Sequence, residues 1–310
     1  MAEGLSAGLR RVPPAGPHGG DGARLAAALG VPPGAVLDLS QSLNPCAGEV
    51  DLLAARRLDA LRRYPDTAEA TIALAVTLGT DPGQVVLTNG GSEAIALVAA
   101  DVQDGWVEAP EFSLYTRHLT SVRPDAGRWR SNPRNPTGAL AGADERAAVW
   151  DEAFWPLTTG TWTRGDAEQG AIVIGSLTKT FSCPGLRMGY VVCPDPTMAE
   201  RLRARQPAWS VGALACALVP DLLDSADLAA WSVSVRVLRG QLADVLEGAG
   251  LAVEVADAPW VLVRGAGDLR ARLAVHAILV RDCVSFGMRD TVRIGVPDEA
   301  GLDRLARALG

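Results

Sequence analysis

One stretch of the sequence, residues 171–193, combines an apolar run with the only lysine in the chain. The run from Ala171 to Ile174 is typical of a buried strand, and a short turn leads from it to Lys179. Arginine stays charged, whereas the pKa of a lysine falls readily on burial, so a buried lysine can supply the neutral amine that forms a Schiff base with an aldehyde. The alternative is a surface lysine kept by chance.

Length and composition limit the class of protein. With 310 residues, 48% of them hydrophobic, the chain can form one large domain with a sizeable core and a smaller domain. Acidic residues outnumber basic ones, 36 to 29, which disfavours a nucleic-acid-binding surface. We see no signal peptide and no apolar stretch of the ~18 residues that a membrane span requires. The five scattered cysteines favour a reducing cytoplasm, with neither a disulfide framework nor a metal site.

A glycine turn marks a second candidate site. Gly90-Gly91-Ser92 lies between an expected strand at 84–87 and a helical run at 95–100. Backbone amides at a helix N-terminus point at anions, and glycine lets the backbone approach them closely. Such a turn is a weak signal by itself, but it is compatible with a phosphate-binding site.

Several motifs together resemble one family. Ser-Leu-Thr-Lys at 176–179, followed by Pro-Gly-Leu-Arg-Met-Gly-Tyr at 184–190, resembles the lysine motif of fold-type-I enzymes that use pyridoxal phosphate (PLP). Residues 131–138, Ser-Asn-Pro-Arg-Asn-Pro-Thr-Gly, are similar to another motif of that family. Within that family the sequence is most similar to the branch of histidinol-phosphate aminotransferases, which includes threonine-phosphate decarboxylases of cobalamin synthesis. The resemblance covers roughly residue 18 to the C-terminus.

The resemblance implies which residues hold the cofactor ring. Lys179 would carry PLP, and Asp151 would pair with the pyridine nitrogen and keep it protonated, which makes the ring an electron sink. Asn135 would donate to the phenolic oxygen of the cofactor. Phe112 would stack on the ring, although a core phenylalanine is a serious alternative.

The resemblance also implies a phosphate site and a dimer. Arg187 would pair with the cofactor phosphate, together with Ser176 and the turn residues Gly91 and Ser92. Tyr64, in a Tyr-Pro motif, would reach the cofactor phosphate of a neighbouring subunit. We therefore expect an obligate homodimer with shared sites, unless Tyr64 is simply packed before a proline turn.

Four further residues resemble substrate-binding positions. Arg293 would clamp the α-carboxylate, and Arg281 would suit a second anion, the substrate phosphate. His18 precedes two glycines, as in the decarboxylases, and would lie near that phosphate; such a histidine is most often a loop residue. Asn44 would lie near the substrate or serve the turn ahead of Pro45.

The sequence predicts an α/β fold with a large PLP-binding domain, built on a mainly parallel sheet, and a small α+β C-terminal domain. We expect a disordered tail at 1–17, an N-terminal arm at 18–40 packing on the small domain, the large domain at 41–205 and the small domain at 206–310. Only 12 residues, 139–150, separate Gly138 from Asp151, fewer than in relatives. They leave room for about one helical turn, so we expect at least one trimmed element in a shortened middle.

The function that this resemblance favours is PLP-dependent decarboxylation of O-phospho-L-threonine in cobalamin synthesis. Phe154 supports it, because many aminotransferase relatives have tyrosine there and the decarboxylases commonly have phenylalanine. One alternative is an aminotransferase acting on histidinol phosphate or a related amino acid, because the same residues would serve both reactions. Another is a non-catalytic PLP-binding protein, suggested by the shortened middle.

Overall fold

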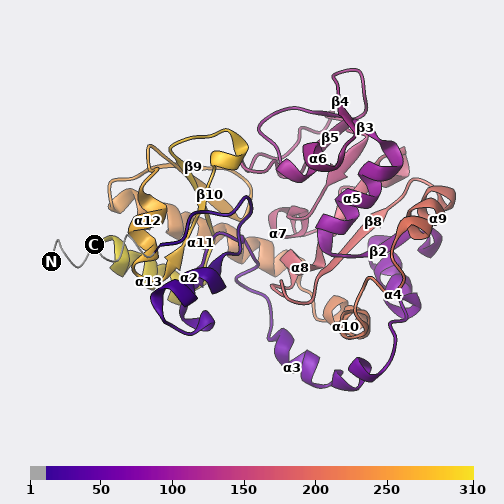
Figure 1. The fold of residues 1–310 in the computed structure, drawn as a ribbon, viewed down its shortest axis with the longest axis horizontal. Helices are drawn as coiled ribbons and strands as arrows, with labels where there is room; N and C mark the ends of the chain where they lie inside the picture. Colours follow the sequence, from indigo (N-terminus) through magenta and orange to yellow (C-terminus); the bar gives the residue numbers. More distant parts are fainter. Residues whose placement is uncertain (1–11) are drawn as a thin grey trace.

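The structure is a computed structural model, and it describes residues 12–310. These residues form two units side by side, each built on its own sheet, and the N-terminal arm crosses the smaller one (Figure 1). Within them, no helix has both the length and the apolar character needed to span a membrane.

The larger unit contains a seven-stranded sheet in the order β2-β8-β7-β6-β5-β3-β4. Only the two pairs made by β8 are antiparallel, and the other four are parallel. The predicted α/β class with a mainly parallel sheet is therefore confirmed. The strands are β2 (Val85–Asn89), β3 (Asp104–Val107), β4 (Ser121–Val122), β5 (Arg128–Ser131), β6 (Val149–Asp151), β7 (Ile172–Gly175) and β8 (Met188–Val192).

Helices cover both faces of this sheet. One face packs against α5 (Gly90–Val102), α6 (Ser113–His118) and α9 (Pro196–Arg205). The other packs against α4 (Ala68–Leu78) and α10 (Ala213–Asp224). Alternate residues of a strand point to opposite faces, so Ile174 joins the first core and Val173 the second. Three short helices complete the unit: α3 (Val50–Ala55), α7 (Trp155–Thr159) and α8 (Leu177–Thr180).

The shortened middle contains strands whose connections have no helix. Residues 123–127 join β4 to β5, residues 132–148 join β5 to β6, and neither connection contains a helix. We expected about one helical turn in the second connection, and it has none. Parallel strands are usually joined by a crossover helix that covers the sheet. Without such a helix, the sheet near β5 and β6 must be covered in another way.

Arginine and tryptophan side chains cover it. Neighbouring strands place Arg128 over the ring of Trp106, at 5.1 Å from the centroid, and Arg130 over Trp150, at 5.8 Å. Glu145, from the helix-free loop, lies 2.7 Å from Arg128 and 2.8 Å from Arg130. This layer shields the sheet with cation–π and ion-pair contacts where a helix would have used apolar ones.

The smaller unit contains an antiparallel sheet in the order β12-β13-β10-β9. The long helix α11 (Leu228–Gly248) contacts both this sheet and α7 of the larger unit. In the arm, a short strand β1 (Leu37–Asp38) pairs with β11, and Leu25 of α2 (Gly22–Leu29) packs against Leu279. The remaining elements are β9 (Ala252–Val255), β10 (Trp260–Arg264), α12 (Leu269–Ala274), β11 (Ile278–Leu279), β12 (Arg281–Asp282), β13 (Thr291–Gly295) and α13 (Glu299–Leu309).

Two boundaries differ from those expected. Helix α10 packs on α4 in the core of the large sheet, so the large unit continues past residue 205. Of the tail expected at 1–17, residues 1–11 lie outside the described residues. The rest is tied to the small unit, because Arg270 donates to the carbonyl of Pro13 and Arg281 to that of Pro17. The proline and glycine content of residues 12–17 gave no sign of these contacts, which come from arginines more than 250 positions away.

Candidate active site

A cavity of about 380 Å³ lies where the two units meet, at the carboxyl ends of β6 and β7. This volume falls in the range of small-molecule sites, and strand ends of α/β sheets are where such sites usually form. Most of the residues predicted for the site line this cavity: His18, Gly91, Ser92, Phe112, Asn135, Asp151, Ser176, Lys179, Arg187, Arg281 and Arg293.

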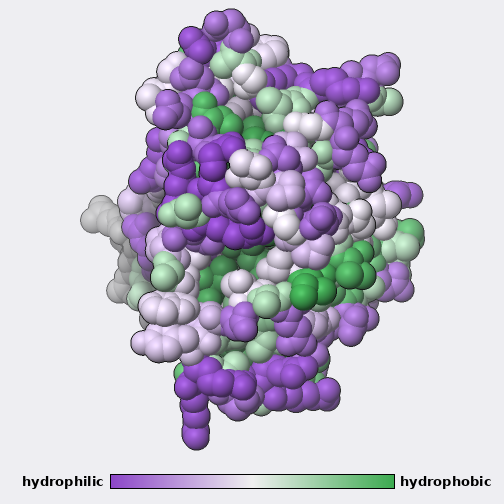
Figure 2. All heavy atoms as spheres, turned by 90° about the vertical axis from the view of Figure 1, so that its right-hand side faces the viewer, coloured by the Kyte–Doolittle hydropathy of each residue, from purple (hydrophilic) through white to green (hydrophobic). Residues whose placement is uncertain are grey.

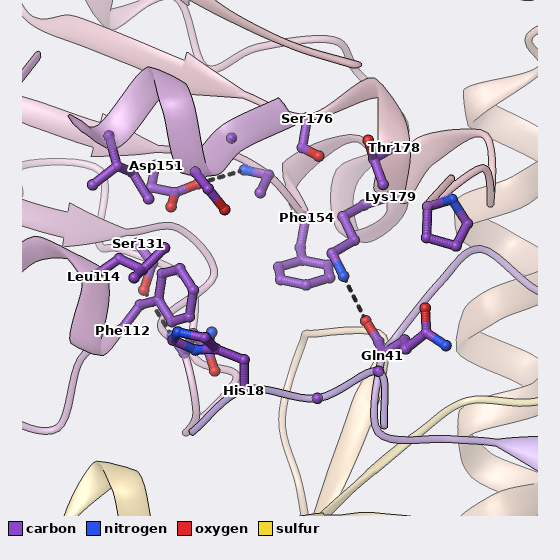
Figure 3. A pocket seen from close by; sticks show the side chains of 18 of the residues that line it. His18, Gln41, Phe112, Leu114, Ser131, Asp151, Phe154, Ser176, Thr178 and Lys179 are labelled. Atoms are coloured by element: carbon purple, nitrogen blue, oxygen red, sulfur yellow. Dashed lines mark hydrogen bonds between the residues drawn. The ribbon is translucent and has the colours of Figure 1, made fainter. Parts of the chain in front are cut away.

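Lys179 points into the cavity from α8, which begins directly after β7 (Figure 3). Its Nζ donates to the carbonyl oxygen of Gln41 at 2.8 Å and lies 5.6 Å from the ring centroid of Phe154. Burial, and then the charges of Arg293 and Arg187, lower the pKa of Lys179 to about 7. A large share of this amine is therefore neutral near neutral pH, as a nucleophile or a proton acceptor requires.

Asp151 stands at the end of β6 and is held by two donors. Its Oδ2 accepts from the hydroxyl of Tyr115 at 2.8 Å, and its Oδ1 accepts from the amide of Ala153 at 3.0 Å. Burial raises the pKa of this carboxyl, while both hydrogen bonds and the nearby Lys179 oppose the rise. Held by these two hydrogen bonds, the Asp151 carboxylate is suited to accept a hydrogen bond from a protonated ring nitrogen.

An anion cradle faces Lys179 at the N-terminus of α5. Gly90 has a φ of 75°, and a Cβ there would lie 2.5 Å from a guanidinium nitrogen of Arg187. Only glycine therefore lets Arg187 lie across this helix N-terminus. Ser92 and Ser176 line the cavity beside it. Helix amides, hydroxyls and a guanidinium form a donor set that suits a phosphate group.

Two arginines face the cavity from adjacent strands of the small sheet. Arg281 and Arg293 are directly opposite each other in the pairing of β12 with β13, and each is only 5% exposed. Arg293 donates to Asn135 Oδ1 at 2.6 Å and to the Ser40 carbonyl at 3.2 Å, while its Nε has no partner within residues 12–310. Burial and the charge of Arg281 lower the pKa of Arg293 to about 10.

Like charges directly opposite each other destabilise a sheet unless something offsets them. No carboxylate forms an ion pair with either Arg281 or Arg293 in the part of the chain that the structure describes. The pair is thus suited to binding anionic groups of a ligand.

His18 is brought in by the arm and lies edge-on to the ring of Phe112, with centroids 5.6 Å apart. Its buried Nδ1 has no hydrogen-bond partner in the described chain. Burial lowers the pKa of His18, and the charges of Arg281 and Arg117 lower it further. A neutral donor or acceptor is therefore available on the wall that carries Arg281.

Two predicted residues lie elsewhere. Tyr64 is 77% exposed and stacks on Trp209, with ring centroids 4.6 Å apart, so it does not reach the cavity of its own chain. Asn44 is buried behind Lys179. Its side-chain nitrogen donates to the Thr180 carbonyl, and its side-chain oxygen accepts from the Cys46 amide.

Sequence reasoning missed Tyr115 and Gln41. Tyr115 lies one helical turn beyond Phe112, a spacing that could have placed both aromatic residues on one side of α6. Gln41 acts through its backbone carbonyl, and any residue at that position could supply the same acceptor. No sequence signal could therefore have identified it.

Comparisons with known proteins agree with this geometry. Residues 129–309 match the family model "Aminotransferase class I and II". The chain is 30% identical to the threonine-phosphate decarboxylase of Salmonella typhimurium, over 94% of this chain and 95% of the relative. It is 28% identical to histidinol-phosphate aminotransferase 2 of Pseudomonas aeruginosa, over 92% of this chain and 91% of the relative.

A solved structure with a similar fold is that of histidinol-phosphate aminotransferase from Sinorhizobium meliloti in complex with pyridoxal-5'-phosphate. Its TM-score is 0.78 at 18% identity, with 97% of this chain and 95% of that chain covered. The alignment with the Salmonella relative spans 351 positions, more than the 310 residues of this chain. The relative therefore carries segments that this chain lacks.

Proposed function

Because this chain belongs to the class I and II aminotransferase family, we propose that it is a PLP-dependent enzyme that decarboxylates O-phospho-L-threonine to aminopropanol phosphate in cobalamin synthesis. The family and its cofactor support the first part of this proposal. The choice of substrate and reaction depends on the cavity described above.

The residues of the cavity fit PLP. The cradle made by the α5 N-terminus, Ser92, Ser176 and Arg187 would hold the phosphate, and Asp151 would face the ring nitrogen. Phe112 would stack on the ring, and Asn135 would contact its phenolic oxygen. When bound, PLP supplies an aldehyde and a protonated ring that withdraws electrons from the substrate.

The side chains of this protein would bind the substrate and move its protons. Lys179 would hold the cofactor, and its amine, with a pKa near 7, could carry a proton and later donate it to the substrate carbon in place of the lost carboxylate. Arg293 would bind the α-carboxylate and fix which bond of that carbon breaks. Asp151 would keep the ring nitrogen protonated, because it is itself held by Tyr115.

The observation that carries the choice of substrate is the buried pair Arg281 and Arg293. O-phospho-L-threonine has a carboxylate and a phosphate, one anion for each arginine. His18, on the same wall, would contact the phosphate. An amino acid with an uncharged side chain would leave Arg281 buried without an anion, which is costly.

Two other functions remain possible outcomes of the test. An aminotransferase acting on histidinol phosphate is supported by the Pseudomonas relative. Phe154 speaks against it, since a phenyl ring offers the cofactor no hydroxyl where many aminotransferases have tyrosine. A non-catalytic PLP-binding protein is disfavoured, because the shortened connections leave all seven strands and the cavity in place.

The test is to load the protein with PLP and supply O-phospho-L-threonine. We expect release of carbon dioxide and formation of aminopropanol phosphate without any added keto acid. A parallel reaction would contain histidinol phosphate and 2-oxoglutarate. Faster formation of glutamate there would make the aminotransferase the better account, and no turnover in either reaction would favour a binding protein.

We further propose a homodimer in the cytoplasm, with Tyr64 of each subunit reaching the cofactor phosphate of the other. The exposure of Tyr64 supports this arrangement, because this side chain does not line the cavity of its own chain and is open to a partner.

A further inference from the structure

Glu111 is a buried carboxylate that the proposed chemistry does not use. It lies between Pro110 and the ring-stacking candidate Phe112, and only 1% of its side chain is exposed. It does not line the cavity. A carboxylate buried this far is costly unless its oxygens accept hydrogen bonds, so its partners show what it does.

Those partners are concentrated on one residue. Glu111 Oε1 accepts from the backbone amide of Ser131 at 3.1 Å, and Oε2 accepts from the Ser131 hydroxyl at 2.5 Å. Arg134 Nε lies 3.5 Å from Oε1. Glu111 thus accepts hydrogen bonds from both donors of Ser131, the last residue of β5.

The contacts continue from Ser131 to the cavity. The Ser131 hydroxyl accepts from the amide of Asn135 at 2.8 Å, and Asn135 Oδ1 accepts from Arg293 at 2.6 Å. Each of these residues is less than 9% exposed. A hydroxyl has a single proton, and donating it to Glu111 leaves the lone pairs of Ser131 directed at Asn135.

We propose that Glu111 is a positioning residue, which holds Ser131 so that Asn135 in turn holds Arg293 in the cavity. Without Glu111 the Ser131 hydroxyl is free to rotate and donate elsewhere, and the 131–135 turn loses its anchor on β5. Arg293 then keeps only the Ser40 carbonyl and the face of Trp260 as partners.

The pKa of Lys179 reports on the position of Arg293. The charged groups that act on this lysine are Arg293, Arg187, Asp38 and Asp151, and Arg293 is the strongest of them. A loosened Arg293 lowers the pKa of Lys179 less, so that pKa moves up. Burial raises the pKa of Glu111 to about 7, so Glu111 is partly ionised where Lys179 titrates, and removing that charge without moving Arg293 would push the pKa of Lys179 down instead.

The experiment uses the single lysine as a probe. Full-length protein is grown with carbon-13-labelled lysine and freed of cofactor, so that one side-chain signal reports Lys179. Its pH midpoint is measured by NMR in the wild type, Glu111→Gln, Ser131→Ala and the double variant. This measurement requires neither cofactor nor substrate, so it stands whether or not the proposed function does.

We expect the midpoint to rise by roughly half a pH unit in Glu111→Gln, as a displaced unit charge predicts. Ser131→Ala, which removes no charge, should raise it similarly, and the double variant should add little, because both residues act through one contact. Glu108→Gln is the matched control. Glu108 also contacts Arg134, but it is half exposed and is not bonded to Ser131, so the midpoint should stay.

Thermal unfolding confirms that each variant is folded, and Ser131→Ala decides alone if Glu111→Gln does not fold. An unchanged midpoint in folded Ser131→Ala overturns the proposal. So does a fall in Glu111→Gln, which would mean that its charge acts directly on Lys179.

Discussion

The hydroxyl of Tyr115 donates to Asp151 Oδ2 at 2.8 Å, and both buried side chains lie in the wall of the cavity. A hydrogen bond to a charged group contributes roughly 1.5–3 kcal/mol. This bond opposes the rise that burial causes in the pKa of Asp151, and it fixes the direction from which Asp151 faces the cavity.

We therefore expect Tyr115→Phe to bind PLP but to lose about ten- to a hundredfold in kcat, as the loss of one such bond implies. The pKa of Asp151 rises when this donor is removed, so the carboxylate is protonated at a higher pH. The acidic limb of the kcat profile should move toward neutral pH. Tyr190→Phe is the control, since Tyr190 is buried in the same sheet and is not bonded to Asp151. Equal losses in both variants would contradict a specific role for Tyr115.

The lone lysine allows a direct test of cofactor attachment. The purified protein should be yellow, and Lys179→Ala should lose that colour. Borohydride should fix the cofactor covalently to a single peptide, the one that contains residue 179, because no other lysine exists in the chain. Mass spectrometry of the digest checks this, and a protein with no labelled peptide would refute the role of Lys179.

The sequence indicated many of the residues that line the cavity, because each of them lies in a recognisable local context. Lys179 follows a strand, Gly91 opens a helix and Asp151 ends another strand, and each of these local contexts can be read within a few residues. The contacts that tune these groups are long-range. Gln41 meets a lysine 138 positions away, and Asn135 meets an arginine 158 positions away.

The fold was predicted less completely where packing overrides the periodic pattern. Helix α4 was missed because Ile72 and Val76 are apolar yet more than half exposed, which hides the 3.6-residue period. Where the connections lack helices, the sheet is covered by Arg128, Arg130 and the tryptophans that they contact. Such cross-strand pairs depend on register, and a single sequence does not give the register.

Glu152, next to Asp151, should make stability depend on pH. It is fully buried, and burial raises its pKa to about 7. Between pH 4.5 and 7, Glu152 keeps its proton in the folded protein but has lost it in the unfolded chain. The free energy of unfolding is therefore highest in acid and falls as the pH rises toward 7. Glu152→Gln should remove part of this fall, on the order of 1–3 kcal/mol.

Denaturant unfolding of the cofactor-free protein between pH 4.5 and 7 measures this. The two unfolding free energies should show their largest difference in favour of the variant at pH 7. The exposed Glu168→Gln is the control and should follow the wild type. A variant whose stability falls with pH as steeply as that of the wild type would show that Glu152 titrates normally.

Arg281 separates phosphorylated from ordinary substrates. Arg281→Ala should weaken binding of O-phospho-L-threonine by about ten- to a hundredfold, the value of a charge-assisted pair, and leave threonine nearly unchanged. Arg293→Ala should weaken both, since both carry the α-carboxylate. The KM values of the two substrates provide the measurement. Equal losses for both in Arg281→Ala would leave a general aminotransferase as the better account.

Tyr64 is one of several exposed apolar side chains in residues 61–76. It stacks on Trp209 at 4.6 Å although both rings are mostly exposed, and Leu61, Ile72 and Val76 are also more than half exposed. Figure 2, which faces the side of the large unit, shows hydrophobic residues gathered just below the middle of this surface, while its lowest part is mostly hydrophilic. We expect light scattering at micromolar concentration to give a dimer, and a monomer would contradict shared sites.

Mixing two inactive variants tests whether Tyr64 acts across the interface. Lys179→Ala and Tyr64→Ala are each expected to be inactive. In a mixed dimer, one site combines the intact lysine of one subunit with the intact tyrosine of the other, and the second site lacks both. Random exchange should therefore restore about a quarter of the sites of the wild type. Lys179→Ala mixed with a variant carrying both substitutions is the control and cannot regain activity. If the first mixture also stays inactive while exchange is shown by mass spectrometry, Tyr64 does not act in the site of the partner subunit.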